Sequence, residues 1–152
     1  MYLKDKLNNY KDKKIIIYVD MDGVIADYDV GLPLKYDQKR PLITSITKLE
    51  EVNKLDNIEL HILSITRMNS GIEEKNIWLD KYASFFKKEN RHIISREQNN
   101  YKKSSLLKLE FLNSINIDDN IIVLIDDDPE ILDIIKDNNP KIVLFKDTVL
   151  VD

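Results

Sequence analysis

Hydrophobic residues gather in five short runs along the chain, and polar residues separate one run from the next. Each run is four to six residues long and is rich in isoleucine, valine or leucine. Such runs are typical of strands that are buried on both faces of a sheet. The five expected strands are residues 15–19, 58–63, 91–94, 121–125 and 141–145.

Between the strands, apolar residues recur every three or four positions, which is typical of amphipathic helices. Ile77, Trp78, Tyr82 and Phe85, for example, fall on or near one helical stripe. The expected helices are residues 44–55, 72–86, 104–115 and 128–138. Alternating strands and helices, joined by right-handed crossovers, predict an α/β fold. We expect a doubly wound, Rossmann-like parallel sheet of about five strands with helices on both faces.

The length of 152 residues suits one compact domain and leaves no room for a second. Residues 1–14 carry charges throughout, so we expect a polar N-terminal segment that is no secretory signal. Residues 15–152 are expected to form the single domain. His61 and His92 lie within expected strands, and we therefore expect each to be a packed or edge side chain rather than a catalyst.

The net charge, the absence of cysteine and the distribution of apolar residues indicate which partners and which cellular compartment to expect. The net charge of −4 gives no sign of a strongly basic face, so tight non-specific binding to nucleic acid has no compositional support, although a local basic groove stays open. The chain has no cysteine, which favours a reducing compartment. No stretch approaches the ~20 apolar residues that a membrane helix needs. We therefore expect a cytoplasmic protein with no membrane partner.

Acidic residues follow two of the expected strands directly. Asp20 and Asp22 come after the first strand, and Asp126 and Asp127 come after the fourth. The C-terminal ends of parallel strands share one edge of the sheet, where such folds bind ligands. Carboxylates about 4 Å apart repel by several kcal/mol, and Mg²⁺, which prefers oxygen ligands, offsets that repulsion. These four residues therefore predict a magnesium site, whereas a polar strand end without function would explain any single one of them.

Two neighbours of these clusters have structural explanations. Gly23 permits a sharp turn beside the ion. Asp128 stands directly before Pro129 at an expected helix start, so it is better explained as the N-cap of that helix.

Residues 20–27 read Asp-Met-Asp-Gly-Val-Ile-Ala-Asp and resemble the first motif, DxDGxxxD, of the haloacid dehalogenase superfamily of phosphohydrolases. The resemblance extends from about residue 15 to about residue 145. It implies that Asp20 is the nucleophile that forms an aspartyl-phosphate, and that Asp22 acts first as general acid and then as general base. The surroundings of Asp22 would then have to raise its pKa above the usual value near 3.9.

The same resemblance suggests residues that bind the phosphate. Ser64, at the expected end of the second strand, would bind a phosphate oxygen, and Arg67 could add a guanidinium contact. A lysine at the start of the helix before the fourth strand would pair with Asp20 and the phosphate. Lys102 and Lys103 both stand there, and Lys103 is preferred.

Residues 20–27 resemble the 5′(3′)-deoxyribonucleotidases in particular, and residues 74–82 resemble the segment that follows the second motif in those enzymes. On that analogy Lys75 contacts the substrate phosphate, although an exposed helix position would explain this lysine equally well. Those enzymes carry a helical cap between the first two motifs. This chain has only the segment 28–40, which we expect to be a loop or small flap, so we expect a core without a cap.

The main expectation is a Mg²⁺-dependent phosphomonoester hydrolase that acts on a 5′- or 3′-nucleoside monophosphate. The phosphatase domain of polynucleotide kinases has a similarly short interval and an Ile-Asp-Asp fourth motif, which resembles residues 125–127 here. A 3′-phosphorylated nucleic-acid end is therefore the alternative substrate. An oligomer in which a second copy supplies a lid also stays open.

Two alternatives come from other classes of protein. A receiver-type signalling module is also doubly wound and metal-binding, but it carries its phosphorylated aspartate at a later strand end. Here the third strand ends in Ser95 and Arg96, and the later acidic cluster follows the lysines, so the order argues against a receiver. A relative that only binds phosphate would have no need of both Asp20 and Asp22.

Overall fold

Five parallel strands form one sheet in the computed structural model, which describes residues 2–28 and 35–151. The strands lie in the order β3-β2-β1-β4-β5, and every neighbouring pair is parallel. Their bounds are β1 Ile15–Val19, β2 Ile58–Thr66, β3 Arg91–Ser95, β4 Ile121–Asp126 and β5 Val143–Lys146. The predicted α/β fold with a parallel sheet of five strands is confirmed.

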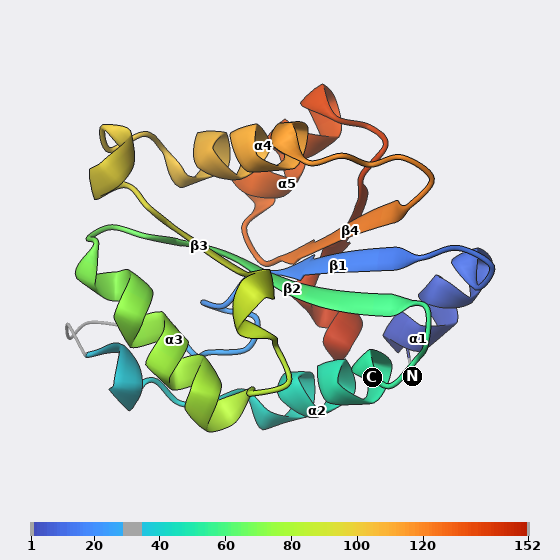
Figure 1. Cartoon of the computed structure of the whole chain (residues 1–152), viewed down its shortest axis with the longest axis horizontal. Coiled ribbons are helices and arrows are strands. Elements are labelled where there is room, and N and C mark those ends of the chain that lie inside the picture. The colour runs from blue at the N-terminus through green and yellow to red at the C-terminus, as the bar shows by residue number, and fades with distance from the viewer. Residues whose placement is uncertain (1, 29–34, 152) are drawn as a thin grey trace.

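Helices cover both faces of the sheet (Figure 1). One face carries α4 (Ser104–Ser114) and α5 (Pro129–Asn138), and the other carries α1 (Tyr2–Leu7), α2 (Ile43–Asn53) and α3 (Ser70–Tyr82). The short 3-10 helices are η1 Asn8–Tyr10, η2 Tyr36–Gln38, η3 Lys88–Asn90, η4 Glu97–Asn99 and η5 Asp147–Leu150. Within the described ranges, no helix has the length and apolar character needed to cross a membrane.

The continuous apolar runs arise because each face of the sheet fills its own hydrophobic core. On β1, Ile15, Ile17 and Val19 enter the core that contains side chains of α1, α2 and α3. Tyr18 enters the second core, which contains side chains of α4 and α5. Successive side chains of a strand point to opposite faces, so a strand covered on both sides needs apolar residues at every position.

Several element bounds differ from the sequence-based expectation. β2 continues to Thr66, so Ser64 lies inside the strand and is fully buried, and β5 begins two residues later than expected. α3 ends at Tyr82, and the side chain of Ile77 on it is 53% exposed. The stripe that included Ile77 was wrong because the buried face of α3 contains a lysine, which a hydrophobic pattern counts as exposed. That face consists of Gly71, Lys75, Trp78 and Leu79.

The first fourteen residues, expected to be a polar segment, contain α1. Leu3 and Leu7 lie one helical turn apart on α1 and are buried in the core, and α1 packs against η5 near the other end of the chain. Burying a leucine side chain contributes roughly 1.5–3 kcal/mol. α1 is therefore part of the packed fold, and the charged residues between the two leucines conceal this in the sequence.

His61 of β2 and His92 of β3 are packed side chains, as expected. Nδ1 of His61 lies 2.8 Å from Nε2 of His92, and the two rings stack with their centroids 5.1 Å apart. Tyr18 and Phe111 contact the His92 ring at centroid distances of 5.8 and 4.8 Å. Burial lowers the pKa of His61, and burial together with the neighbouring His61 lowers the pKa of His92 to about 4.

Acidification is expected to destabilise the fold through His92. A histidine of the unfolded chain has a pKa of 6.5, whereas that of His92 in the fold is about 4. Between these pH values only the unfolded state takes up the proton, so stability is fully present above pH 6.5 and falls as the pH decreases toward 4. After discounting for the partial exposure of the ring, we expect a loss of about 1–2 kcal/mol.

Chemical denaturation at several pH values checks this expectation. His92→Phe retains an aromatic ring and removes the titration, so its stability should fall less steeply with acid than that of the wild type. The slopes are compared rather than the absolute values, because the variant also loses the contact with His61 at every pH. Equal acid slopes in the two proteins would contradict the prediction.

Candidate active site

Carboxylates at the ends of β1 and β4 meet at the centre of the sheet. β1 and β4 are neighbours, and the strand order reverses between them, so their C-terminal ends flank the point where such sheets bind ligands. Carboxylate oxygens of Asp20, Asp126 and Asp127 all lie within 4.8 Å of one another. The structure thus brings together three of the four acidic residues that the sequence assigned to a metal.

A tight turn after β1 shapes this cluster. The carbonyl oxygen of Met21 accepts hydrogen bonds from the backbone N–H groups of residues 24–26, at 2.9–3.1 Å. Gly23 within the turn has a φ of 81°, and a Cβ there would lie 2.2 Å from Oδ2 of Asp127. A side chain at this position would therefore push the turn away from Asp127.

The cation of the cluster is Lys108. Its Nζ lies 2.6 Å from Oδ2 of Asp126 and 3.0 Å from Oδ1 of Asp20, and its side chain is only 2% exposed. Burial alone would lower the pKa of Lys108, but the two carboxylates raise it above its usual value. Burial raises the pKa of Asp20, and the Lys108 ammonium opposes that rise. Lys108 therefore stays charged and offsets the repulsion between Asp20 and Asp126.

The expectation that Lys102 or Lys103 pairs with Asp20 was wrong. Lys102 lies 3.0 Å from Glu110, and Lys103, whose side chain is 75% exposed, lies 3.8 Å from Glu130. Both lysines precede α4, whereas Lys108 stands on the buried face of that helix beside Ser105, Leu107 and Leu112. A lysine at helical spacing among buried positions is the sequence signal that could have found it.

Lys75 lies beside Ser64 and Asp22, whereas its contact with a substrate phosphate stays a prediction. Its buried ammonium donates to Oγ of Ser64 at 2.6 Å, to the carbonyl oxygen of Ile65 at 2.8 Å and to Oδ2 of Asp22 at 3.2 Å. Gly71 lets α3 approach the end of β2 closely, since a Cβ at this position would lie 1.8 Å from Oγ1 of Thr66. The close approach of α3 to the end of β2 therefore places Lys75, one turn later, against Ser64.

Arg67 is placed differently from Ser64. It follows the last residue of β2, and its side chain is exposed. Ser64 and Lys75 are in contact, whereas Arg67 does not line the cavity beside the carboxylates. A contact between Arg67 and a substrate remains a prediction.

Asp22 is held by donors from two parts of the chain. Besides Lys75, the hydroxyl of Tyr36 donates to its Oδ1 at 2.8 Å, and the ammonium of Lys39 donates to the same oxygen at 2.7 Å. Tyr36 and Lys39 belong to the segment 28–40, which we call the flap; residues 29–34 of the flap lie outside the described residues. Nothing in the sequence singled out Tyr36 or Lys39, because the 3-10 helix η2 is too short for a hydrophobic period to reveal it.

The charge state of Asp22 differs from the expectation. Burial alone would raise its pKa, but Lys75, Lys39 and the Tyr36 hydroxyl together hold the pKa below its usual value. The expected rise is thus wrong for this arrangement, in which Asp22 is ionised. Both oxygens of Asp22 are paired, and Asp22 stands apart from the group formed by Asp20, Asp126 and Asp127.

A cavity of about 190 Å³ opens beside the three carboxylates and is lined by Asp20, Asp22, Lys108 and Asp127, among others. Oδ1 of Asp127 is buried and has no hydrogen-bond partner among the described residues. A buried oxygen without a partner is costly, and the candidate ligand atoms of Asp20, Asp126 and Asp127 are carboxylate oxygens, which suit a hard divalent cation. The residues present therefore fit Mg²⁺.

Two further side chains complete the rim of this cavity. The hydroxyl of Tyr28, which the sequence analysis did not single out, donates a hydrogen bond to Oδ2 of Asp127. Asp128 caps α5, as predicted, by accepting a 2.9 Å hydrogen bond from the backbone N–H of Glu130. Asp128 therefore stabilises the start of α5 at the edge of the site.

Comparison with known proteins identifies similar folds. No protein-family model and no curated protein sequence matches the chain. A chain of the Pnkp1/Rnl/Hen1 RNA repair complex is similar, with a TM-score of 0.68 and 20% identity over 89% of this chain and 42% of that chain. A chain in a second structure of the Pnkp1/Rnl/Hen1 complex gives a TM-score of 0.69 and 20% identity, over 88% of this chain and 46% of that chain. The present chain thus spans less than half the length of these neighbours, and what it shares with them is the fold.

Proposed function

We propose that this chain is a Mg²⁺-dependent phosphatase that removes a phosphate from a nucleic-acid end through an aspartyl-phosphate on Asp20. The observation that carries the proposal is the buried Asp20, 3.0 Å from the Lys108 ammonium and grouped with Asp126 and Asp127. The resemblance of residues 20–27 to the haloacid dehalogenase superfamily supports the same chemistry. Asp20, Asp126, Asp127 and the Lys108 ammonium lie at the edge where a sheet of this topology binds its ligand.

The proposed reaction has two steps. An oxygen of Asp20 attacks the phosphorus and forms the aspartyl-phosphate, while the bond from phosphorus to the leaving oxygen breaks and Asp22 gives that oxygen a proton. Water then attacks the phosphorus, gives a proton to Asp22 and releases inorganic phosphate together with the free Asp20 carboxylate. A bound Mg²⁺ would neutralise negative charge on the carboxylates and the phosphate.

Lys75 and Ser64 are the proposed phosphate ligands. Both are buried, and they are already in contact with each other at 2.6 Å. A phosphate that binds Lys75 gives this ammonium a second anion and weakens its hold on Oδ2 of Asp22. Asp22 can then take up the proton that the first step needs, although its pKa is low in the arrangement described above.

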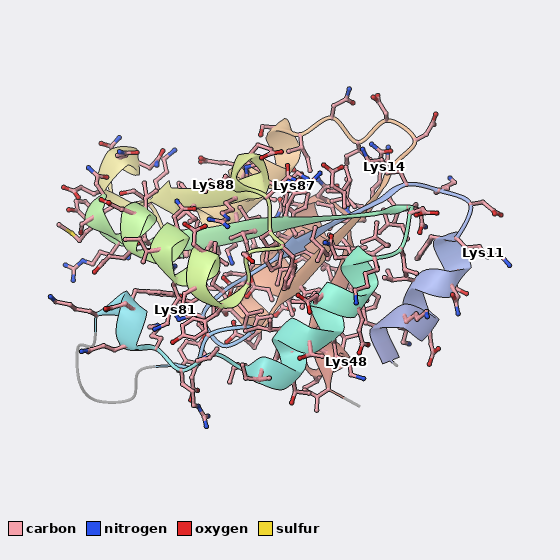
Figure 2. The ribbon with its side chains drawn as sticks, turned by 60° about the horizontal axis from the view of Figure 1, so that its bottom comes forward. Lys11, Lys14, Lys48, Lys81, Lys87 and Lys88 are labelled. Atoms are coloured by element: carbon pink, nitrogen blue, oxygen red, sulfur yellow. The ribbon has the colours of Figure 1, made fainter. Side chains whose placement is uncertain are left out.

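The fold likeness to a chain of an RNA repair complex favours a phosphorylated RNA end over a free nucleotide. A nucleoside monophosphate is the second candidate, supported by the resemblance of residues 20–27 and 74–82 to the deoxyribonucleotidases. An RNA end would be recognised at its terminal phosphate rather than along a broad basic surface. The lysines labelled in Figure 2 are dispersed: Lys48 lies on α2, Lys81 on α3 and Lys87 and Lys88 at η3, whereas Lys11 and Lys14 lie between η1 and β1.

Phosphate release from two kinds of substrate tests the proposal. We expect a 3′-phosphorylated oligoribonucleotide to be hydrolysed with a kcat/KM at least about ten-fold above that of 3′- and 5′-nucleoside monophosphates, which corresponds to roughly 1.4 kcal/mol of additional transition-state binding. Removing Mg²⁺ with EDTA should stop the reaction, and adding Mg²⁺ back should restore it.

Each part of the proposal has its own contrary outcome. Faster hydrolysis of the mononucleotides would replace the RNA end by a nucleotide as the substrate. Full activity in EDTA would contradict the metal requirement. No phosphate release from the oligonucleotide, from the mononucleotides or from p-nitrophenyl phosphate would refute the phosphatase.

A further inference from the structure

Two flap side chains hold one particular oxygen of Asp22. Oδ1 accepts from the Lys39 ammonium at 2.7 Å and from the Tyr36 hydroxyl at 2.8 Å. Among the residues that the structure describes, Oδ2 has a single, longer contact, 3.2 Å to the Lys75 ammonium, and Lys75 has two shorter contacts with other acceptors. The two oxygens are thus held unequally, with Oδ1 anchored and Oδ2 only loosely paired.

The flap donors are themselves fixed by packing on α3. Nε1 of Trp78 donates to the carbonyl oxygen of Lys39 at 3.0 Å, and the Tyr36 ring meets the Trp78 ring edge-on at a centroid distance of 6.0 Å. The Lys39 ammonium lies 4.8 Å from the centroid of the Tyr36 ring. Tyr36 and Trp78 are buried, and the Lys39 side chain is only 10% exposed. This end of the flap therefore presents donors in a fixed place.

We propose that Tyr36 and Lys39 are positioning residues that anchor Oδ1 of Asp22, so that Oδ2 meets the leaving oxygen of the substrate. The inference rests on the proposed phosphatase function and extends it to the flap. When Lys75 turns to the phosphate, Oδ2 becomes free, whereas Oδ1 stays bound to the flap. The proton that passes to the leaving oxygen is then carried on Oδ2, as the bond between phosphorus and that oxygen breaks and the bond from Asp20 to phosphorus forms.

This role predicts a dependence on the leaving group. A sugar hydroxyl is a poor leaving group that needs the proton from Asp22, whereas p-nitrophenol leaves readily without one. Loss of the anchor should therefore slow the hydrolysis of a sugar phosphate and spare p-nitrophenyl phosphate. A purely structural role of the two flap residues would slow both reactions to the same extent.

The experiment compares Lys39→Met and Tyr36→Phe with the wild type in Mg²⁺ on a 3′-phosphorylated oligoribonucleotide and on p-nitrophenyl phosphate. For Lys39→Met we expect kcat on the oligonucleotide to fall about ten- to a hundred-fold with little change in KM, because a misplaced acid loses most of its effect. On p-nitrophenyl phosphate the loss should stay below about three-fold. Lys39→Arg should restore most of the oligonucleotide rate, since it keeps a cation at this place.

Lys35→Met is the matched control, because Lys35 is exposed on the same flap. It should leave both rates unchanged. Trp78, the only tryptophan, reports by fluorescence whether each variant is folded, and Tyr36→Phe keeps the aromatic packing if Lys39→Met does not fold. Equal losses on both substrates, or no loss on either, would overturn the inference while leaving the phosphatase in place. An inactive wild type would overturn the proposed function and this inference with it.

Discussion

Asp20→Asn is expected to abolish phosphate release while the protein remains folded. The amide has the size of the carboxylate but is no nucleophile, so the aspartyl-phosphate cannot form. Removing the nucleophile of a covalent mechanism lowers kcat by about a thousand-fold or more. The measurement is the rate of phosphate release from p-nitrophenyl phosphate and from a 3′-phosphorylated oligoribonucleotide in Mg²⁺.

The stability of Asp20→Asn should change little. Lys108 loses one anion but keeps Asp126, whose Oδ2 lies 2.6 Å away, and the repulsion between Asp20 and Asp126 disappears. We therefore expect a change in the free energy of unfolding of about 1 kcal/mol or less. Asp133→Asn, at an exposed position on α5, is the matched control and should retain full activity. An Asp20→Asn protein with wild-type activity would exclude Asp20 as the nucleophile.

Lys108→Met is expected to have the largest effect on stability. The methionine matches the length of the lysine, but it leaves Asp20 and Asp126 without the cation that lies 3.0 and 2.6 Å from them. Asp126 is fully buried. Removing one partner of a buried ion pair destabilises a protein by about 3–5 kcal/mol, which chemical denaturation measures directly. Activity should also be lost, because the Asp20 carboxylate is no longer held.

Lys103→Met provides the matched control for Lys108→Met. Lys103 precedes the same helix, but its side chain is 75% exposed and lies 3.8 Å from Glu130. An exposed pair of this kind contributes at most about 1 kcal/mol, so both stability and activity should stay close to the wild type. The opposite result, with an active Lys108→Met and an inactive Lys103→Met, would assign the role beside Asp20 and the phosphate to Lys103, as the sequence had suggested.

The sequence by itself determined the fold class and the centre of the candidate site. Buried strands reveal themselves through continuous apolar runs, and the chain direction of parallel strands places the residues that follow them at one edge. Asp20 follows β1, Asp126 is the last residue of β4 and Asp127 comes directly after it, so their meeting could be predicted without coordinates. Ser64 could be predicted from its place on β2 as well, although the strand runs two residues past it.

Only the tertiary structure decided which cations meet these carboxylates. Lys108 and Lys75 lie on buried helix faces, but a hydrophobic pattern counts each lysine as exposed. Lys39 and Tyr36 come from the flap, whose short 3-10 helix η2 is too brief for a hydrophobic period. Whether such a side chain is paired depends on which distant segments the strand order brings beside it. The low pKa of Asp22 has the same origin, since three donors from two separate parts of the chain outweigh the rise that burial would cause. Local periodicity records which face of an element is buried, whereas the pairing of charges between elements exists only once the sheet has formed.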